Sequence, residues 1–371
     1  MSDASGADRQ PIRLESDADV GALIALAGLP NLTPKRFWSL IALGSPSCVW
    51  KKVIAGGAPR HGRGRDAAIG WPGWSTLIDP EVEFERHRRC GVDVLPFGHE
   101  GYPDALLDDP EPPVVIFRHG PQPLDDRVRI SIVGTRKCTP YGRDIARELG
   151  AALAGRGVDV VSGLASGIDA AAHAGAAGVD PSRTVAVVAG GVDVVYPVSN
   201  SGLYRTVGEH GALLSEWPLG ARPEKWRFPA RNRLVAALSA ATVVVESPEK
   251  GGSMYTVDEA LQRNRAVFAV PGNIHSPVSR GTNKLIADGA HALYDFEHLL
   301  DTVAPRSGPV PVQVKLGIDS WLLEAIGWEP IALDAVVGEC GRTPSEVTLE
   351  VERLIGNGAV RRLGGVIERV A

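Results

Sequence analysis

Five short glycine segments in the middle of the chain carry hydroxyl, amide or basic side chains that could bind phosphate. They are Gly134-Thr135-Arg136, the segment 162–169, Gly190-Gly191, Gly251-Gly252-Ser253 and Pro271-Gly272-Asn273. Glycine lets an anion approach the backbone closely, and serine, threonine and arginine add donors for phosphate oxygens. The strict GxGxxG fingerprint is absent after the first strand of this region, so we expect no nicotinamide cofactor.

The densest group of donors lies in the segment 228–234, at what reads as the start of a helix. Arg231 and Arg233 could each hold a phosphate with a two-pronged guanidinium, reinforced by the helix dipole. The alternative is structural, with the two arginines paired to acidic neighbours such as Glu246. Glu216, which precedes a tryptophan, is likewise expected to be an arginine partner rather than a base.

Asp169 and His173 stand four residues apart, so they share one face of a helix and could mimic an acid/base pair. The favoured interpretation is structural, with Asp169 capping its helix and His173 holding the loop by hydrogen bonding. No Ser/His/Asp set accompanies them in the sequence. Four widely separated cysteines form no metal-binding or disulfide pattern, and we expect no metal or other cofactor.

The glycine segments follow short apolar runs that alternate with helical patterns. The runs are 114–117, 130–133, 158–162, 184–189, 212–215, 242–246 and 266–270. Continuous Val/Ile/Ala runs between amphipathic helices predict an α/β fold, a doubly wound and mainly parallel Rossmann-like sheet covered on both faces. Ligands bind beyond the carboxyl ends of such strands, which is where the glycines fall.

The chain of 371 residues is predicted to contain three domains and a linker. An N-terminal helical module (12–110) contains helices near 20–27, 35–43 and 47–55, the second capped by Thr33 and Pro34. Its loop at 56–74, with Arg60, Arg63 and Arg65, is predicted to be an exposed insertion rather than a nucleic-acid contact. The sheet domain (111–303) and a Pro-rich linker (304–317) follow.

The last predicted domain (318–371) has the helix, helix, helix and strand-hairpin pattern of a winged helix. Nine acidic against five basic residues give it a formal charge of −4, so we favour a protein contact or a regulatory role over DNA reading. The formal charge of the whole chain is −5, so any phosphate-binding site must be a groove in which basic residues are concentrated. No window approaches about 18 uninterrupted apolar residues, and we expect a cytoplasmic protein without a membrane span.

Six separated motifs, in order, resemble the signature series of the DprA/Smf DNA-processing family across about 130–290. They are 133–136, 162–169 with His173, Tyr196-Pro197, Ser215-Glu216, Phe228-Pro229 with Arg231-Asn232-Arg233, and Pro271-Gly272 with Gly281 and Leu285-Ile286. The resemblance implies a homodimer, not an enzyme, that binds and protects single-stranded DNA and loads the RecA recombinase during natural transformation. Single-strand-binding protein is a further partner to consider.

Carried over by motif, the residues expected to bind DNA are Arg136, Gly163, Ser166, Gly167, Arg231, Asn232, Arg233 and Lys284. Gly134 and Gly272, with Asp169 and His173, are expected to shape the loops. Many family members carry lysine directly after Tyr-Pro, whereas this chain has Val198, so either affinity is reduced or a nearby arginine such as Arg205 substitutes.

The alternative function is a nucleotide-phosphate-binding enzyme or sensor related to the nucleotide phosphoribohydrolases. Those enzymes rely on a Pro-Gly-Gly loop, a following Gly-Thr and a catalytic glutamate. Here Pro271-Gly272-Asn273 is followed by Gly281-Thr282, and Lys284 stands near where the acid is expected. A cation there can bind phosphate but cannot act as the missing carboxylate.

Overall fold

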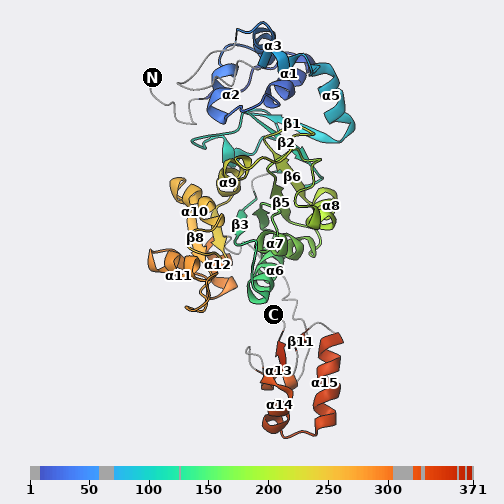
Figure 1. Ribbon diagram of the computed structural model, residues 1–371, viewed down its shortest axis with the longest axis vertical. Coiled ribbons are helices and arrows are strands. Elements are labelled where there is room, and N and C mark those ends of the chain that lie inside the picture. Colours follow the sequence, from blue (N-terminus) through green and yellow to red (C-terminus); the bar gives the residue numbers. More distant parts are fainter. Residues whose placement is uncertain are drawn as a thin grey trace. The chain divides into compact units, whose positions relative to one another are not determined.

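The computed structural model describes residues 9–57, 71–124, 127–303, 321–326, 331–356, 359–363 and 366–369. The chain divides into two compact units, Met1–Pro305 and Arg306–Ala371. Each unit has its own hydrophobic core. Figure 1 shows the helices and strands of both units.

Within the described residues of the larger unit, nine strands form one sheet in the order β1-β2-β6-β5-β4-β3-β7-β8-β9. They are β1 (Val92–Pro96), β2 (Val115–His119), β3 (Arg129–Val133), β4 (Asp159–Ser162), β5 (Thr184–Val187), β6 (Ala212–Ser215), β7 (Ala241–Val244), β8 (Ala266–Ala269) and β9 (His291–Ala292). All pairs from β6 to β9 along the sheet are parallel. Strands β1 and β2 extend the sheet beyond β6 as antiparallel neighbours.

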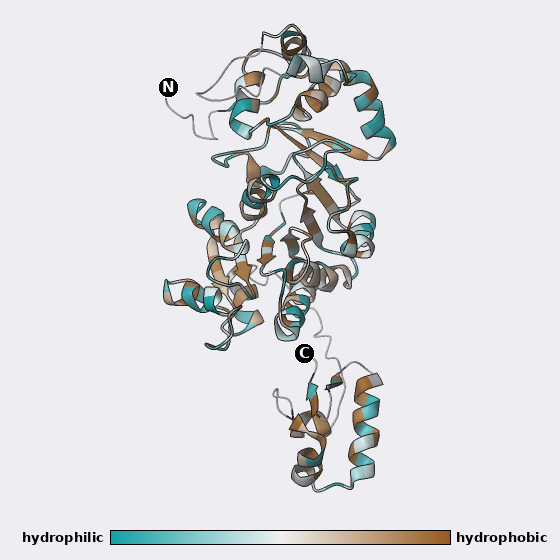
Figure 2. Cartoon of the chain, in the orientation of Figure 1, coloured by the Kyte–Doolittle hydropathy of each residue, from teal (hydrophilic) through white to brown (hydrophobic). Residues whose placement is uncertain are grey.

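Helices cover both faces of this sheet, as the sequence predicts for continuous apolar strands. They are α6 (Pro140–Gly155), α7 (Ile168–Ala177), α8 (Ser201–His210), α9 (Arg227–Ala237), α10 (Ser253–Gln262), α11 (Arg280–Ala287) and α12 (Phe296–Val303). Leu149 of α6 and Ala172 of α7 pack in one core, and Leu234 of α9 and Val257 of α10 pack in the other. Figure 2 shows brown, apolar strands enclosed between these helices. The predicted Rossmann-like α/β fold is confirmed.

The sheet reverses its winding between β3 and β7. From β3 the chain adds β4, β5 and β6 on one side and then returns to place β7 on the other side of β3. The connections that leave β3 and β7 therefore run in opposite directions and open a crevice at the carboxyl ends of the strands.

The N-terminal part of this unit is helical and joins the sheet through β1 and β2. It contains α1 (Asp17–Ala27), α2 (Pro34–Ile41), α3 (Pro46–Ile54), α4 (Trp71–Ser75) and α5 (Pro80–Arg89), and a short 3-10 helix, η3 (Asp104–Leu106), lies between β1 and β2. The Thr33 side chain accepts a hydrogen bond from the Arg36 amide and Pro34 is the first residue of α2, so the predicted cap is confirmed. Strand β1 and helix α5 were not predicted from the sequence.

The smaller unit contains α13 (Trp321–Ala325), β10 (Ile331–Ala332), α14 (Leu333–Cys340), α15 (Pro344–Gly356), β11 (Val360–Leu363) and β12 (Val366–Arg369). Its strands pair antiparallel in the order β10-β12-β11. The three predicted helices and the hairpin are present, and β10 was not predicted. The winged-helix assignment stays a prediction.

Several predicted features lie outside the described residues. They are Arg60, Arg63 and Arg65 of the 56–74 loop, the Pro-rich linker 304–317, and the Gly364-Gly365 turn. Among the described helices, none is both long enough and apolar enough to cross a membrane.

Candidate functional site

A cavity of about 690 Å³ opens at the crevice where the sheet reverses its winding. Three connections line it: residues after β3 (Gly134, Arg136), after β4 (Gly163, Asp169) and after β7 (Gly251). Helices α9 and α10 close its far side with Pro229, Arg231, Asn232, Val235, Ser253, Tyr255 and Thr256. The site thus combines three loops with the N-terminal residues of α10, whose backbone N–H groups favour an anion.

Arg231 supplies a buried positive charge to this cavity. Its side chain is only 4% exposed, and one guanidinium nitrogen donates to the Val187 carbonyl. The Nε atom is buried and has no hydrogen-bond partner among the described residues. Burial lowers the pKa of Arg231 to about 10, partly offset by Asp169, so the group stays charged at neutral pH. A buried cation with spare donor capacity is suited to an anionic ligand.

Asp169 closes the loop that follows β4. Its carboxylate accepts a hydrogen bond from the Gly163 amide at 3.2 Å and faces the Arg231 charge. Burial raises the pKa of Asp169, and Arg231 opposes that shift. A Cβ atom at Gly163 would lie 2.3 Å from an Arg231 guanidinium nitrogen, so a larger residue there would displace the guanidinium. Asp169 therefore has a structural task in the loop, although it closes the loop rather than accepting from its own helix start.

His173 lies in the core between β5 and Ser162, the last residue of β4. The side chain is fully buried, and Nδ1 lies 2.6 Å from the Thr184 hydroxyl at the start of β5. Burial lowers the pKa of His173 to about 3, so the imidazole is neutral. His173 does not line the cavity, which leaves Asp169 without an acid/base partner there.

Aromatic rings and two further cations form the rim of the cavity. The Phe228 ring lies 5.4 Å from Tyr196 and 5.3 Å from the Arg136 guanidinium, measured between ring centroids and to the guanidinium carbon. Tyr196 is 45% exposed and Tyr255 is 59% exposed. The exposed Lys225 also lines the cavity. The described lining contains three cations, Arg136, Lys225 and Arg231, and one carboxylate, Asp169. Its formal charge is therefore +2, whereas the formal charge of the whole chain is −5.

Glu246 anchors the loop that carries Arg136, a role that sequence reasoning missed. This buried side chain, after β7, accepts hydrogen bonds from the Thr139 amide at 2.8 Å and the Thr139 hydroxyl at 2.6 Å. Thr139 in turn caps α6 by accepting from the Gly142 amide. Gly167, with φ at +83°, lies against the Thr135 carbonyl, where a Cβ atom would come within 2.4 Å. Glu246 is thus bound to α6 and not to the arginines.

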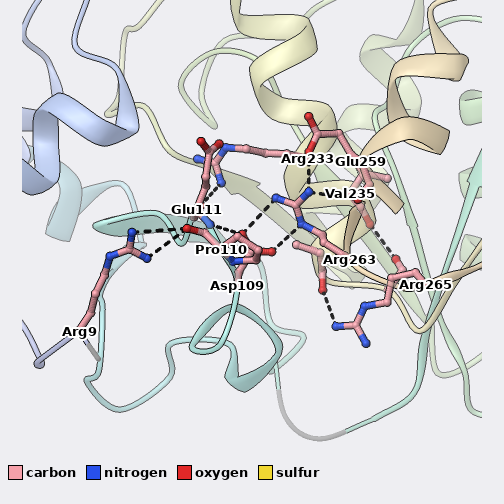
Figure 3. Close-up of polar contacts among 11 residues, drawn as sticks. Arg9, Asp109, Pro110, Glu111, Arg233, Val235, Glu259, Arg263 and Arg265 are labelled. Carbon is pink, nitrogen blue, oxygen red and sulfur yellow. Dashed lines mark hydrogen bonds and ion pairs between the residues drawn. The ribbon is translucent and has the colours of Figure 1, made fainter. Parts of the chain in front are cut away.

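Arg233 points away from the cavity and into a buried ionic network (Figure 3). It pairs with Glu216 and donates to the Glu111 carbonyl at 2.6 Å. In the same network Arg263, which directly follows α10, pairs with Asp109 at 2.6 Å. Arg231 and Arg233 of α9 therefore separate, with Arg231 at the cavity and Arg233 holding the segment before β2. Glu216 is an arginine partner, as the sequence indicates.

The remaining predicted residues lie outside the lining of the cavity. Lys284 is 57% exposed and pairs with Asp288 at 3.1 Å. Gly272 exchanges hydrogen bonds with the Asn283 amide group and shapes the loop after β8. Ser166 and Gly167 belong to the loop after β4 but do not face the cavity.

Gly190-Gly191 and Val198, which the sequence singled out, are not part of the described lining of the cavity. The backbone of Gly190-Gly191 packs against the loop after β6, with the Gly191 amide donating to the Ala221 carbonyl at 2.8 Å. Val198, where many members of the family have lysine, is 76% exposed on the 3-10 helix η4 (Val198–Asn200). Lys225 lines the cavity together with Arg136 and Arg231, whereas Arg205 does not. The position of Lys225 three residues before Phe228 was the signal available in the sequence. No cluster of three or more potential metal ligands occurs among the described side chains.

Comparison with known proteins identifies the family. Residues 93–304 match the family model for DNA recombination-mediator protein A. The DNA processing protein DprA of Bacillus subtilis is 39% identical over 222 residues, which are 60% of this chain and 74% of that protein. The crystal structure of DNA processing protein A from Streptococcus pneumoniae aligns with a TM-score of 0.63 and 26% identity, covering 78% of this chain and 99% of that one.

A second solved structure, DNA processing protein A from Helicobacter pylori, concerns the single-stranded DNA binding mode of that protein. It aligns with a TM-score of 0.51 and 28% identity, covering 57% of this chain and 94% of the other. The family model covers more than half of the chain, including the whole cavity lining. The chain belongs to the DprA/Smf family of DNA-processing proteins.

Proposed function

We propose that this protein binds single-stranded DNA in the cavity between β3 and β7 and delivers it to the RecA recombinase. The observation that carries the proposal is the combination of a buried guanidinium, Arg231, with exposed aromatic rings at the same cavity. Phosphates need cations and N–H donors, whereas unpaired bases need flat apolar faces on which to stack. Duplex DNA keeps its bases stacked inside, so Tyr196 and Phe228 favour a single strand.

The DNA contacts that we propose are Arg136, Lys225, Arg231 and Asn232, with backbone donors from the start of α10. Gly163 contributes through the close backbone approach that glycine allows, because its amide is engaged by Asp169. Ser166 and Gly167 contribute through the shape of the loop after β4. Lys284 would contact DNA only where the strand leaves the cavity. Arg233 is left out because its guanidinium is occupied by Glu216 and the Glu111 carbonyl.

Binding rather than catalysis fits the carboxylates of the site. Asp169 is the carboxylate in the described lining, and it is engaged by the Gly163 amide and the Arg231 charge. A hydrolase of the phosphoribohydrolase kind needs a carboxylate aimed at its substrate. The cavity would nevertheless accept a free nucleotide phosphate, so the experiment must separate a strand from a mononucleotide.

The test is fluorescence anisotropy with a labelled oligothymidylate, a duplex of equal length and a panel of competing mononucleotides. We expect the protein to prefer the single strand. Arg136→Gln combined with Lys225→Gln should weaken binding at least about tenfold, because charge-assisted hydrogen bonds contribute about 1.5–3 kcal/mol each. The slope of log K against log salt should fall by roughly 0.7 for each phosphate that the variant no longer neutralises.

Arg205→Gln is the matched control, because Arg205 is exposed on α8 and does not line the cavity. Equal affinity for single strand and duplex, or full displacement of the strand by one mononucleotide, would contradict the proposal. So would an unchanged salt slope in the double variant.

Delivery to RecA rests on membership of the family. Delivery to RecA predicts that the protein helps RecA to assemble on DNA already coated with single-strand-binding protein. A RecA filamentation assay on coated DNA that gives the same rate with and without the protein would remove this part of the proposal and leave DNA binding intact.

We also propose a homodimer through α10. Of the apolar residues in 254–268, Val257, Ala260 and Phe268 are buried in the core and Met254 is half-buried. The exposed apolar surface of α10 consists of Leu261 and Tyr255, which are 56% and 59% exposed. Sedimentation equilibrium at micromolar concentration should show a dimer that Leu261→Asp dissociates, and a monomeric wild type would rule it out.

A further inference from the structure

A second cavity, of about 410 Å³, lies between the N-terminal helices and the loop that joins β6 to α9. Helix α1 contributes Ile24 and Ala27, and Trp74 of α4 and Ile78 line another side. The loop contributes residues 217–222 and Glu224, and α9 contributes Arg227. None of these residues has a role in the function proposed above.

Trp217 and Arg227 form one wall of this cavity, and Trp226, outside the lining, packs against Arg227. The Arg227 guanidinium carbon lies 5.2 Å from the ring centroid of Trp217 and 5.3 Å from that of Trp226, and the two rings are 6.0 Å apart. Arg227 is fixed further by its ion pair with Glu224 at 2.7 Å. Against this rigid side stands Trp74, whose side chain is 43% exposed. A flat aromatic ligand could therefore stack at small entropic cost on an ordered surface.

The charges of the cavity leave one cation available to a ligand. The described lining is neutral in sum, with Glu83 and Glu224 against Arg222 and Arg227. Arg227 is paired with Glu224, whereas Arg222 is exposed and makes no ion pair within the described part of the chain. Arginine beside apolar and aromatic surface is the chemistry that recognises a base with its phosphate.

The two cavities share one loop. Lys225 and Phe228 face the first cavity, whereas Arg222, Glu224 and Arg227 face the second. The loop is anchored by the Gly191 amide on the Ala221 carbonyl and by the Gly220 amide on Asp193, both at 2.8 Å. Consecutive Cα atoms are about 3.8 Å apart, so Arg222 and Lys225 are at most about 11 Å apart. Stacked nucleotides rise about 3.4 Å each, and about three of them cover that length.

We propose that the second cavity takes one unpaired base of the same DNA strand, stacked on Trp74, with its phosphate at Arg222. This inference rests on the proposed binding of single-stranded DNA and extends it by a few nucleotides across the loop. The strand would pass from the cations of the first cavity over Lys225 to the aromatic surface of the second.

The experiment measures the affinity of the full chain for oligothymidylates of increasing length, from about 3 to about 16 nucleotides. For the wild type we expect a step in affinity when the strand becomes long enough to reach the second cavity. Trp74→Ala should abolish that step, a loss of roughly 5- to 100-fold on long strands, and leave the shortest binding strand unaffected. Trp74→Tyr should retain most of the step, because tyrosine also stacks. Leu77→Ala is the control, since Leu77 is 78% exposed nearby and does not line the cavity.

Arg222→Gln is a second variant that does not depend on the packing around Trp74. It should lower the salt slope on long strands by roughly 0.7 and leave short strands unchanged. If Trp74→Ala and Arg222→Gln bind every length as the wild type does, the second cavity takes no base and the inference is overturned. If the wild type binds no single strand at all, the proposed function itself has failed, and the two failures are thereby distinguished.

Discussion

Arg233 and Glu216 form the ion pair whose removal should separate folding from DNA binding. Their side chains are 4% and 11% exposed, and Arg233 also donates to the Glu111 carbonyl at 2.6 Å. Arg233→Met would leave the Glu216 carboxylate buried without its cation. Losing one partner of a buried pair costs about 3–5 kcal/mol, a large part of a typical stability of about 5–15 kcal/mol.

The double variant Arg233→Met with Glu216→Leu removes both charges and keeps similar volumes. Because no uncompensated charge remains, it should recover most of the stability lost in Arg233→Met. Thermal and urea unfolding followed by circular dichroism would measure the set. We expect the single variant to lower Tm by roughly 6–20 °C. At a temperature where it is folded, its affinity for single-stranded DNA should match that of the wild type.

The opposite pattern would refute this reasoning. If Arg233→Met unfolds like the wild type and instead binds DNA at least about tenfold more weakly, Arg233 must reach the ligand, and the two-arginine phosphate site suggested by the sequence would be restored.

Two further predictions concern pH and the smaller unit. Burial, with a smaller effect of Asp144, raises the pKa of Glu148 from 4.5 to about 7. The folded state therefore binds this proton more tightly than the unfolded state does. The stability of the fold falls as the pH rises from about 4.5 through about 7. Glu148→Gln should therefore raise Tm at pH 8 but not near pH 4, and equal gains at both values would contradict the assignment. Truncation after Pro305 should leave the salt slope of DNA binding unchanged, because Arg361 and Arg362 are paired with glutamates inside the smaller unit. A slope reduced by the equivalent of about two phosphates would show that this unit binds DNA.

The parallel sheet and its site could be predicted because their signals are local. Each strand from β3 to β8 is a short apolar run, and a glycine segment follows most of these strands where the chain turns at the edge of the sheet. The family motifs added the order of the segments. Strand β1 is harder to predict because Val92–Pro96 is interrupted by Asp93, and it becomes a strand through its antiparallel pairing with β2.

The different roles of Arg231 and Arg233 in α9 could not be predicted from composition alone. Both residues are arginines, but residues two apart on a helix do not face the same side. Only the packed structure shows that one side meets the cavity and the other meets Glu216. Lys225 escaped prediction for a related reason, since a loop residue acquires its role from the cavity that the loop happens to border.

Helix α9 therefore serves the cavity with one side and the stability of the fold with another. Asn232 stands between Arg231 and Arg233 and lines the same cavity as Arg231. The Glu216 pair holds a different side of the helix, so its loss should lower stability without lowering affinity while the helix stays folded. Substitutions in 231–233 must consequently be judged by stability and affinity together. A loss of DNA binding at Arg233 without a matching stability measurement does not identify a DNA contact.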